Sequence, residues 1–148
     1  MRPPSEPAWS AGAGGAGIGR VTGAVRGPVL GVGVDAVDPE RLRRVLARRP
    51  TLEARLFTPA ERDRARGTHR VARLSTRFAA KEATWKALGV GLGAVGLQDV
   101  EMVDGGDRAP RLCLHGRAAS LARAAGVRRW HVSVSHTDRV AIAVVLAE

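Results

Sequence analysis

The sequence has one cysteine, no tyrosine and few other aromatic residues, and each shortage excludes a class of protein. Because Cys113 has no partner in the chain, neither an intrachain disulfide nor a zinc site built from several cysteines can form. Aromatic residues make up 3% of the sequence, so stacking platforms for single-stranded nucleic acid are scarce. No apolar run has the length of a membrane span, and the N-terminus lacks the apolar segment of a signal peptide. We therefore expect a cytoplasmic protein with no part in the membrane.

Lysine is also rare, although the chain is strongly basic. Arginine and lysine total 24 residues against 14 acidic ones, giving a formal charge of +10, yet the only lysines are Lys81 and Lys86. A basic protein favours anionic partners, such as a phosphorylated ligand, an acidic protein or nucleic acid. Arginine is dense between residues 40 and 73, a pattern that a solvated arginine-rich surface also produces. The charge alone does not choose among these partners.

Composition divides the chain into a tail and one small domain. Residues 1–27 are rich in Gly, Ala and Pro and have no hydrophobic periodicity, which predicts a disordered tail or linker. The sequences GAGGAG at 12–17 and GLGAVG at 91–96 match G-x-G-x-x-G. Neither follows a predicted strand, so we do not expect either to bind a dinucleotide. Residues 28–148 have the length of a single domain.

The first half of this domain is predicted to contain one strand followed by helices. A β-branched run at 29–34 predicts a core strand. The sequence TPAE at 58–61 is a capping box, which predicts that a helix begins there. A longer helical pattern runs from 71 to 88 and ends where Gly89 supplies a cap.

A basic amphipathic helix is predicted directly after the first strand. Asp38 is placed to cap this helix, and Pro39 occupies its first position. The residues on its apolar face are Leu42, Val45 and Leu46. The residues on its opposite face are Arg41, Arg44 and Arg48. This arginine face suits an acidic partner.

The second half of the domain is predicted to be mainly β-structure. Residues 97–103 alternate as a strand does, and 112–114 is a shorter candidate strand. An Ala-rich segment at 117–125 predicts a helix that Gly126 closes. The segments RWHVSVSH and RVAIAVVLA flank a tight turn at 137–138, which predicts an antiparallel hairpin. The order of elements indicates an α+β domain with helices packed on a mainly antiparallel sheet.

The segment FAAKEATWKALG places an acidic residue between the two lysines. Glu82 and Lys86 are four residues apart, so one interpretation is an ordinary ion pair on a helix surface. Aromatic residues flank Glu82, however, so its face of the helix is expected to be partly apolar. Asp35 stands at the end of the predicted apolar strand, and a buried acid needs a partner or a metal. Two such carboxylates with lysines nearby are suited to Mg²⁺ and a diphosphate.

A second candidate segment is SVSH at 133–136, which ends a predicted strand at the tip of the hairpin. A histidine in a turn is often only an exposed surface residue. The alternative interpretation is that Ser135 and His136 contact a phosphate.

Three segments in this order resemble the holo-(acyl carrier protein) synthase type of 4'-phosphopantetheinyl transferase. They are GVDAVDPERL at 33–42, FAAKEATWKALG at 78–89 and SVSH at 133–136. The resemblance covers about residues 29 to 146 and rests on G-x-D near the start and K-E-x-x-x-K on a later helix. It implies transfer of the phosphopantetheine arm of coenzyme A to a serine of an apo carrier protein, with Mg²⁺ as cofactor and 3',5'-ADP as product.

The resemblance also implies roles for individual residues. Asp35 and Glu82 would bind Mg²⁺, and Lys86 would hold the diphosphate of coenzyme A, so these three residues would form the catalytic group. The other residues expected along coenzyme A are Lys81, Ser135 and His136 near its phosphates and Pro110 beside its adenine. The residues expected to dock the carrier protein are Arg41, with Arg44 and Arg48 on the same helix face. Asp35 and a metal-bound water are both open as the base that takes the serine proton.

Finally, the resemblance implies the 4'-phosphopantetheinyl transferase fold in a single lobe that trimerises, with sites between subunits. The apolar segment at 140–147 suits burial between subunits, although a central strand covered on both faces would have the same composition. Whether the carrier serves fatty acid or polyketide biosynthesis is open. Two other functions are also open: a basic nucleic-acid-binding domain, and a non-catalytic module that interacts with carrier proteins.

Overall fold

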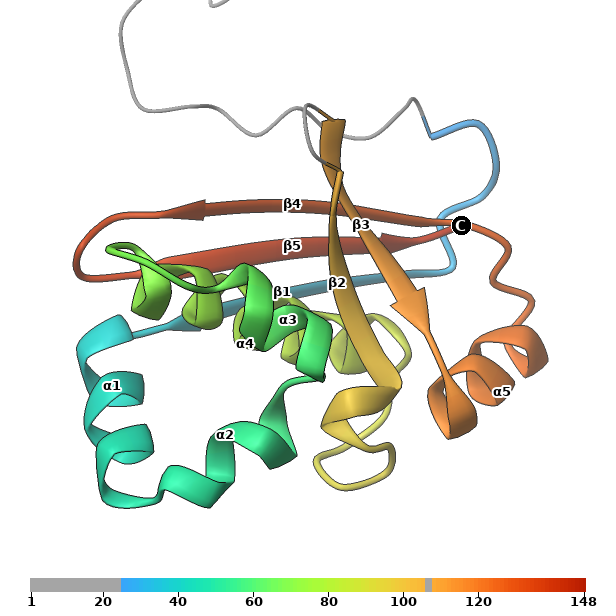
Figure 1. Cartoon of the computed structure of the whole chain (residues 1–148). Coiled ribbons are helices and arrows are strands. Elements are labelled where there is room, and N and C mark those ends of the chain that lie inside the picture. Colours follow the sequence, from blue (N-terminus) through green and yellow to red (C-terminus); the bar gives the residue numbers. More distant parts are fainter. Residues whose placement is uncertain (1–24, 106–107) are drawn as a thin grey trace, which may run out of the picture.

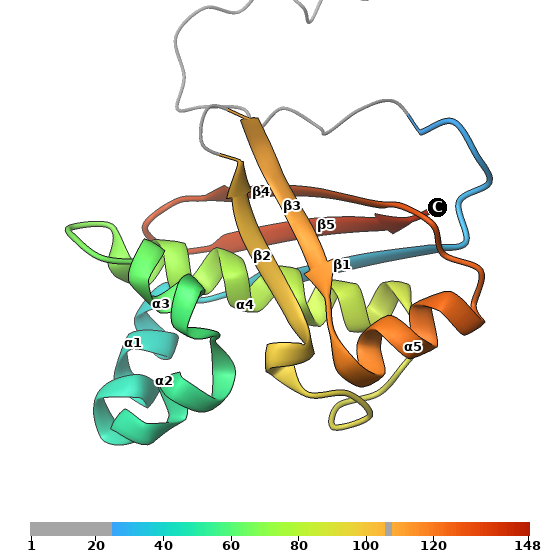
Figure 2. The same cartoon turned by 45° about the vertical axis from the view of Figure 1, so that its right-hand side comes forward.

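A long helix runs along one antiparallel sheet, and a second, smaller sheet crosses it (Figures 1 and 2). The computed structural model describes residues 25–105 and 108–148. The predicted tail at 1–27 lies almost entirely outside these residues, as does the GAGGAG motif at 12–17, so both stay predictions.

The larger sheet has three strands in the order β1-β5-β4, and every pair is antiparallel. Its strands are β1 (Gly31–Val37), β4 (Trp130–His136) and β5 (Ala141–Ala147). The smaller sheet is the antiparallel pair β2 (Val100–Gly105) and β3 (Arg108–Leu114). The predicted α+β class, with a mainly antiparallel sheet and a C-terminal hairpin, is confirmed.

Helices fill the space beside these sheets. Three short helices, α1 (Pro39–Arg48), α2 (Pro50–Leu56) and α3 (Pro59–Arg64), gather at one end of the molecule (Figure 1). The long helix α4 (Arg70–Ala87) packs on β1 and β5, and α5 (Gly116–Ala124) lies at the opposite end (Figure 2). A 3-10 turn, η2 (Leu97–Asp99), leads into β2. No helix within 25–105 or 108–148 is both long and apolar enough to cross a membrane.

The predicted helix starts are present in the structure. Asp38 caps α1 by accepting hydrogen bonds from the backbone N–H groups of Glu40 and Arg41, at 2.9 and 3.1 Å. Thr58 and Glu61 form the capping box of α3. Gly89 follows α4 with a φ of 68°, a conformation that glycine adopts without strain. These local signals therefore place α1, α3 and the end of α4 correctly.

Two glycines let α4 lie directly against β1. A Cβ atom on Gly31 would stand 1.9 Å from the carbonyl oxygen of Ala87, and one on Gly33 would stand 1.8 Å from that of Ala83. No side chain fits in either gap, so backbone touches backbone. The side of α4 that faces β1 carries buried alanines at intervals of four residues, Ala79, Ala83 and Ala87. This contact fixes how far β1 lies from α4.

Several predicted details are wrong. The first strand runs from 31 to 37 instead of 29 to 34, so Asp35 lies inside it and Val32 and Val34 are exposed. The predicted strand at 97–103 begins as the η2 turn, because Asp99 bonds the backbone N–H of Gly96. Val45 is exposed, whereas Leu42 and Leu46 pack into a small core with Phe57 and Leu74. The helix α2 was not predicted.

Candidate active site

Asp35, Glu82 and Lys86 meet where β1 lies on α4, and we call these three residues the carboxylate site. Alternate residues of a strand share a face, so Asp35 points to the same side as Gly31 and Gly33, toward α4. The Lys86 Nζ lies 2.8 Å from Asp35 Oδ1 and also donates to the carbonyl of Val34 at 2.9 Å. The carboxylate site thus depends on the glycine contact, which brings the strand within reach of the helix.

The carboxylate site has more acidic than basic groups, and this excess affects the pKa of Glu82. Burial is the largest cause that raises the pKa of Glu82, and the neighbouring Asp35 carboxyl raises this pKa further. Lys86 lowers the same pKa, but its effect is the smaller one. Two carboxylates share this site with one ammonium, so an additional cation or proton would relieve their repulsion.

The residues of the carboxylate site fit Mg²⁺. Asp35 Oδ2 is buried and has no hydrogen-bond partner among the described residues, whereas Oδ1 is taken by Lys86. Glu82 supplies a second carboxylate. Across the described part of the chain no group of three or more His, Cys, Asp or Glu residues is arranged for a metal ion. Magnesium is often bound by only one or two carboxylates, with water and phosphate oxygens completing its shell.

The structure does not bring Lys81 to this site, so its contacts give no support to the prediction that it lies near the phosphates of a ligand. Its side chain is fully buried, and its Nζ lies 2.7 Å from Glu61 Oε2. The same ammonium donates to the carbonyl oxygens of Leu97, at 2.9 Å, and of Val100. An ammonium has three donors, and these three partners use all of them. Burial lowers the pKa of Lys81, although Glu61 opposes the change.

Ser135 and His136 stand apart from the carboxylate site within one chain. Asp35 pairs with Ala143 of β5, and β4 lies on the far side of β5. Two strand spacings separate β1 from β4, which is roughly 10 Å. Ser135 and His136 are neighbours on a strand, so they face opposite sides of the sheet. The two side chains therefore cannot contact one phosphate from the same side of this sheet.

His136 instead lines a surface pocket at the hairpin tip. The pocket also includes Pro39 and Arg43 at the start of α1 and His69 before α4. Because α1 begins two residues after β1 ends, this pocket lies at the same end of the sheet as the C-terminal end of β1.

Pro110 and the arginine face lie on other elements. Pro110 is half-buried in β3, near the irregular register between Val103 and Gly105 of β2. Arg77 of α4 holds this strand pair through an ion pair of 2.6 Å with Asp104. The expected docking residues Arg41, Arg44 and Arg48 are all exposed on α1, as the helix periodicity predicts.

The residues that the sequence argument missed are Gly31, Gly33 and Glu61. The capping box identifies Glu61 as a cap of α3, but nothing in its local sequence indicates that the same carboxylate binds Lys81. Gly33 begins the G-x-D motif and both glycines interrupt an apolar run, but neither pattern was taken to indicate a contact with a helix. A glycine in a strand is a known signal of close backbone approach, and here it would have indicated the helix contact.

Comparison with known proteins gives a consistent result. The family model described as the 4'-phosphopantetheinyl transferase superfamily matches residues 31–145. The holo-[acyl-carrier-protein] synthase of Moorella thermoacetica is 47% identical over 121 residues, which cover 81% of this chain and 94% of the relative.

Solved structures give the same picture. The crystal structure of holo-[acyl-carrier-protein] synthase from Neisseria meningitidis superposes with a TM-score of 0.74 at 29% identity, covering 82% of this chain and 99% of that one. The Helicobacter pylori enzyme of the same name, solved in complex with coenzyme A, superposes with a TM-score of 0.70 at 26% identity. This match covers 79% of the chain and 99% of that structure.

Proposed function

Since the chain belongs to the 4'-phosphopantetheinyl transferase superfamily, we propose that it is a holo-(acyl carrier protein) synthase. It transfers the 4'-phosphopantetheine arm of coenzyme A to a serine hydroxyl of an apo acyl carrier protein and releases 3',5'-ADP. The names of its relatives and the coenzyme A bound in the Helicobacter pylori structure support this reaction. The observation that carries the proposal is the meeting of Asp35, Glu82 and Lys86 at one point.

The carboxylate site has the chemistry that this reaction needs. Asp35 Oδ2 and the Glu82 carboxylate would hold Mg²⁺, which when bound neutralises charge on the diphosphate of coenzyme A. Lys86 is half-exposed, so its ammonium can turn from Asp35 to a diphosphate oxygen. The exchange of one anionic partner for another keeps the lysine charge compensated throughout.

The bond changes are those of a phosphoryl transfer. The serine oxygen of the carrier attacks the β-phosphorus of coenzyme A, a new P–O bond forms, and the bond to 3',5'-ADP breaks. The serine proton passes to a base, for which the chain offers the Asp35 carboxylate. Lys86 holds the diphosphate in place and offsets the charge that develops on the leaving group.

The carrier protein is expected to dock on α1. Arg41, Arg44 and Arg48 are exposed on this helix, whose first turn follows directly from the strand that carries Asp35. Carrier proteins are acidic, so this basic surface would orient the serine toward the carboxylate site. We expect the reaction to take place in the cytoplasm.

We also propose that the chain works as a homotrimer with sites between subunits. The face of the larger sheet turned away from α4 exposes Val32, Val34 and Ile142, at 57%, 51% and 39% of their surface. A contiguous apolar face of this kind favours burial against another copy. The separation of His136 from Asp35 within one chain gives a second reason, because a neighbouring copy can supply His136.

The assembly is tested by complementation. An inactive Glu82→Gln protein is mixed with an inactive His136→Ala protein under conditions that allow subunits to exchange. Shared sites regain part of the activity, because some interfaces combine two intact halves. A fully active monomer by light scattering, or no rescue after proven exchange, contradicts the trimer.

The reaction itself is tested by mass spectrometry. The protein is incubated with coenzyme A, Mg²⁺ and an apo acyl carrier protein, and the carrier is then weighed. We expect a gain of one phosphopantetheine arm on the carrier serine, and no gain when a chelator removes the metal. An unchanged carrier mass, combined with salt-sensitive DNA binding, would favour a nucleic-acid-binding domain instead.

A further inference from the structure

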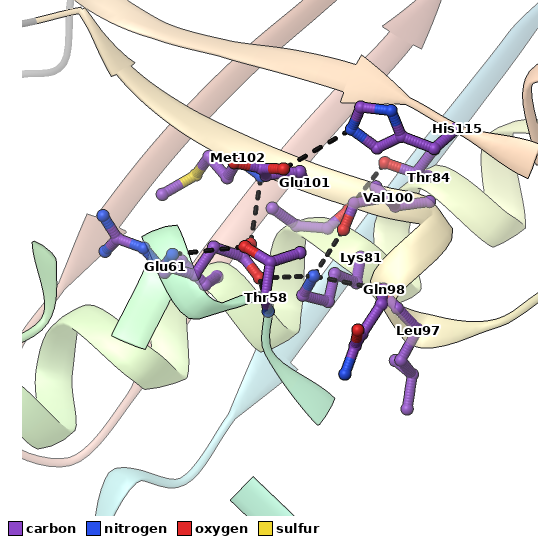
Figure 3. Close-up of polar contacts among 12 residues, drawn as sticks. Thr58, Glu61, Lys81, Thr84, Leu97, Gln98, Val100, Glu101, Met102 and His115 are labelled. Atoms are coloured by element: carbon purple, nitrogen blue, oxygen red, sulfur yellow. Dashed lines mark hydrogen bonds and ion pairs between the residues drawn. The ribbon is translucent and has the colours of Figure 1, made fainter. Parts of the chain in front are cut away.

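Lys81 and Glu61 form a polar cluster that is closed to solvent (Figure 3). Both side chains are fully buried. Besides its 2.7 Å contact with Lys81, the Glu61 carboxylate accepts hydrogen bonds from the backbone N–H groups of Thr58 and Met102, each at 3.0 Å. The ring of Phe57 lies 5.9 Å from the Lys81 Nζ. The cluster therefore ties α3, α4, η2 and β2 together at one point.

The cluster holds α4 on the side opposite to its glycine contact. Successive residues of an α-helix are turned by about 100°, so Lys81 and Ala83 project from roughly opposite sides. Ala83 faces Gly33 of β1, whereas Lys81 faces η2 and β2. Glu82 stands between them on the flank of the helix. The direction of the Glu82 carboxylate is thus set by how α4 is rotated about its own axis.

The apolar contact of α4 with β1 limits the distance between the two elements. It consists of small alanine side chains and bare glycine backbone, which offer few interlocking groups. Lys81 is different, because its ammonium reaches two carbonyl oxygens and a carboxylate whose positions are fixed by other elements. Hydrogen bonds are directional, so three of them at one nitrogen fix the angle of the helix as well as its distance.

We propose that Lys81 and Glu61 are a positioning pair, which fixes the rotation of α4 and thereby holds the Glu82 carboxylate beside Asp35. This inference rests on the proposed role of Glu82 as a Mg²⁺ ligand. A carboxylate about 6 Å from the helix axis moves by about 1.5 Å when the helix rotates by about 15°. A displacement of about 1 Å at a reacting centre can reduce the rate by about a hundredfold.

The test removes the pair without leaving a buried charge. The variant Lys81→Met with Glu61→Gln replaces the ammonium by an apolar chain of similar length and keeps an amide oxygen for the N–H of Met102. The control is Leu74→Ala, which opens a cavity in the same helix about two turns before Lys81 and leaves the polar contacts of Lys81 in place. Each protein is assayed for carrier modification, and its affinity for Mn²⁺ in the presence of coenzyme A is measured by electron paramagnetic resonance.

We expect the double variant to be folded, to bind Mn²⁺ at least tenfold more weakly and to lose at least tenfold in kcat. Its KM for the carrier should stay within twofold of the wild-type value, because α1 is untouched. The Leu74→Ala protein should keep the Mn²⁺ affinity within twofold.

A double variant that matches the control in Mn²⁺ affinity and kcat overturns the inference, because the pair then contributes stability alone. A wild-type chain that leaves the carrier unmodified contradicts the proposed function instead, so the two failures are distinct. Should the double variant not fold, Glu61→Gln alone is compared with the same control and the same criteria apply.

Discussion

The two lysines of α4 stand five residues apart, and each is paired with a carboxylate from another element, yet their surroundings differ. The closed pair, Lys81 with Glu61, is fully buried, and the Lys81 ammonium has a partner for each of its donors. In the open pair, Lys86 with Asp35, the lysine side chain is 54% exposed and one Asp35 oxygen has no partner among the described residues. When every donor and acceptor of a pair already has a partner, no polar atom is left for a ligand to bind. The open pair still has such an atom, the Asp35 oxygen without a partner among the described residues. The closed pair therefore supports the fold, and the open pair is suited to chemistry.

The largest effect is expected at Glu82, which completes the open pair's site. Replacement of Glu82 by Gln should lower carrier modification on the order of a thousandfold, because the amide is a poor ligand for Mg²⁺. The fold should stay intact, since the two side chains have nearly the same shape. The measurement is carrier mass against time, with a thermal melt as control. Full activity of this variant with Mg²⁺ would show that Glu82 is not a ligand of the metal.

The closed pair should respond in stability. Lys81→Met alone leaves the Glu61 carboxylate buried without its counterion, and breaking a buried pair in this way costs about 3–5 kcal/mol. Urea denaturation measures this loss in the free energy of unfolding. A loss below about 1 kcal/mol would show that the closed pair is not what holds η2 and β2 to α4.

The same substitution at Lys86 should have the opposite profile, which makes it the matched control. Lys86→Met removes an ion pair whose lysine is exposed although Asp35 is mostly buried, so the expected stability loss, about 1 kcal/mol, is smaller than that for Lys81→Met. Activity should fall about a hundredfold, because the diphosphate loses a charge-assisted contact. Equal stability losses for Lys81→Met and Lys86→Met would erase the distinction between the two pairs.

A smaller effect is expected on α1, outside both pairs. Reversing Arg41 and Arg44 to Glu should raise the apparent KM for the carrier about tenfold and weaken its dependence on salt, because both residues lie on the exposed face. Calorimetry should show coenzyme A affinity nearly unchanged. A collapse of that affinity would place these arginines in the nucleotide site instead.

The smallest expected effect is on pH dependence. The folded-state pKa of Glu82 is raised above its ordinary value of 4.5, so the metal-free folded chain binds more protons than the unfolded chain in that range. Its stability should therefore fall as the pH rises from 4.5 through the folded-state pKa. The Glu82→Gln protein lacks this group, so it should gain stability relative to wild type across the same range. Paired thermal melts without metal measure the difference, and a constant difference would contradict the shift.

Local signals were enough to predict much of the fold. The caps at Asp38 and Thr58 act within a few residues of sequence, so the starts of α1 and α3 could be predicted without knowledge of their neighbours. The hairpin of β4 and β5 could also be predicted locally, because its turn and the alternating apolar residues of its two strands lie in one continuous stretch of sequence.

The errors concern contacts between distant segments. Lys81 and Lys86 look alike in the sequence, and only the position of β2 and η2 decides that one ammonium is enclosed. For β1, an apolar run with glycines does not reveal which residues face the helix. The predicted ends of this strand therefore differ from the observed ones, and Val32 was expected in the core although it is exposed. The acid–base pattern of the site was predictable because it is local to α4, whereas the partners that orient it were not.

The contact between β1 and α4 has a consequence for how this site can change. Where Gly33 meets Ala83, the separation of strand and helix is set by main-chain atoms alone, with no side chain to shorten or lengthen. The closest approach of strand and helix is therefore fixed, whereas the rotation of α4 depends on contacts elsewhere in the interior, such as that of Lys81 with Glu61. A single added methyl group at Gly31 or Gly33 would push the two elements apart. Engineering a different ion or ligand preference can thus change the side chains at 35 and 82 or the rotation of α4, but not the distance between β1 and α4.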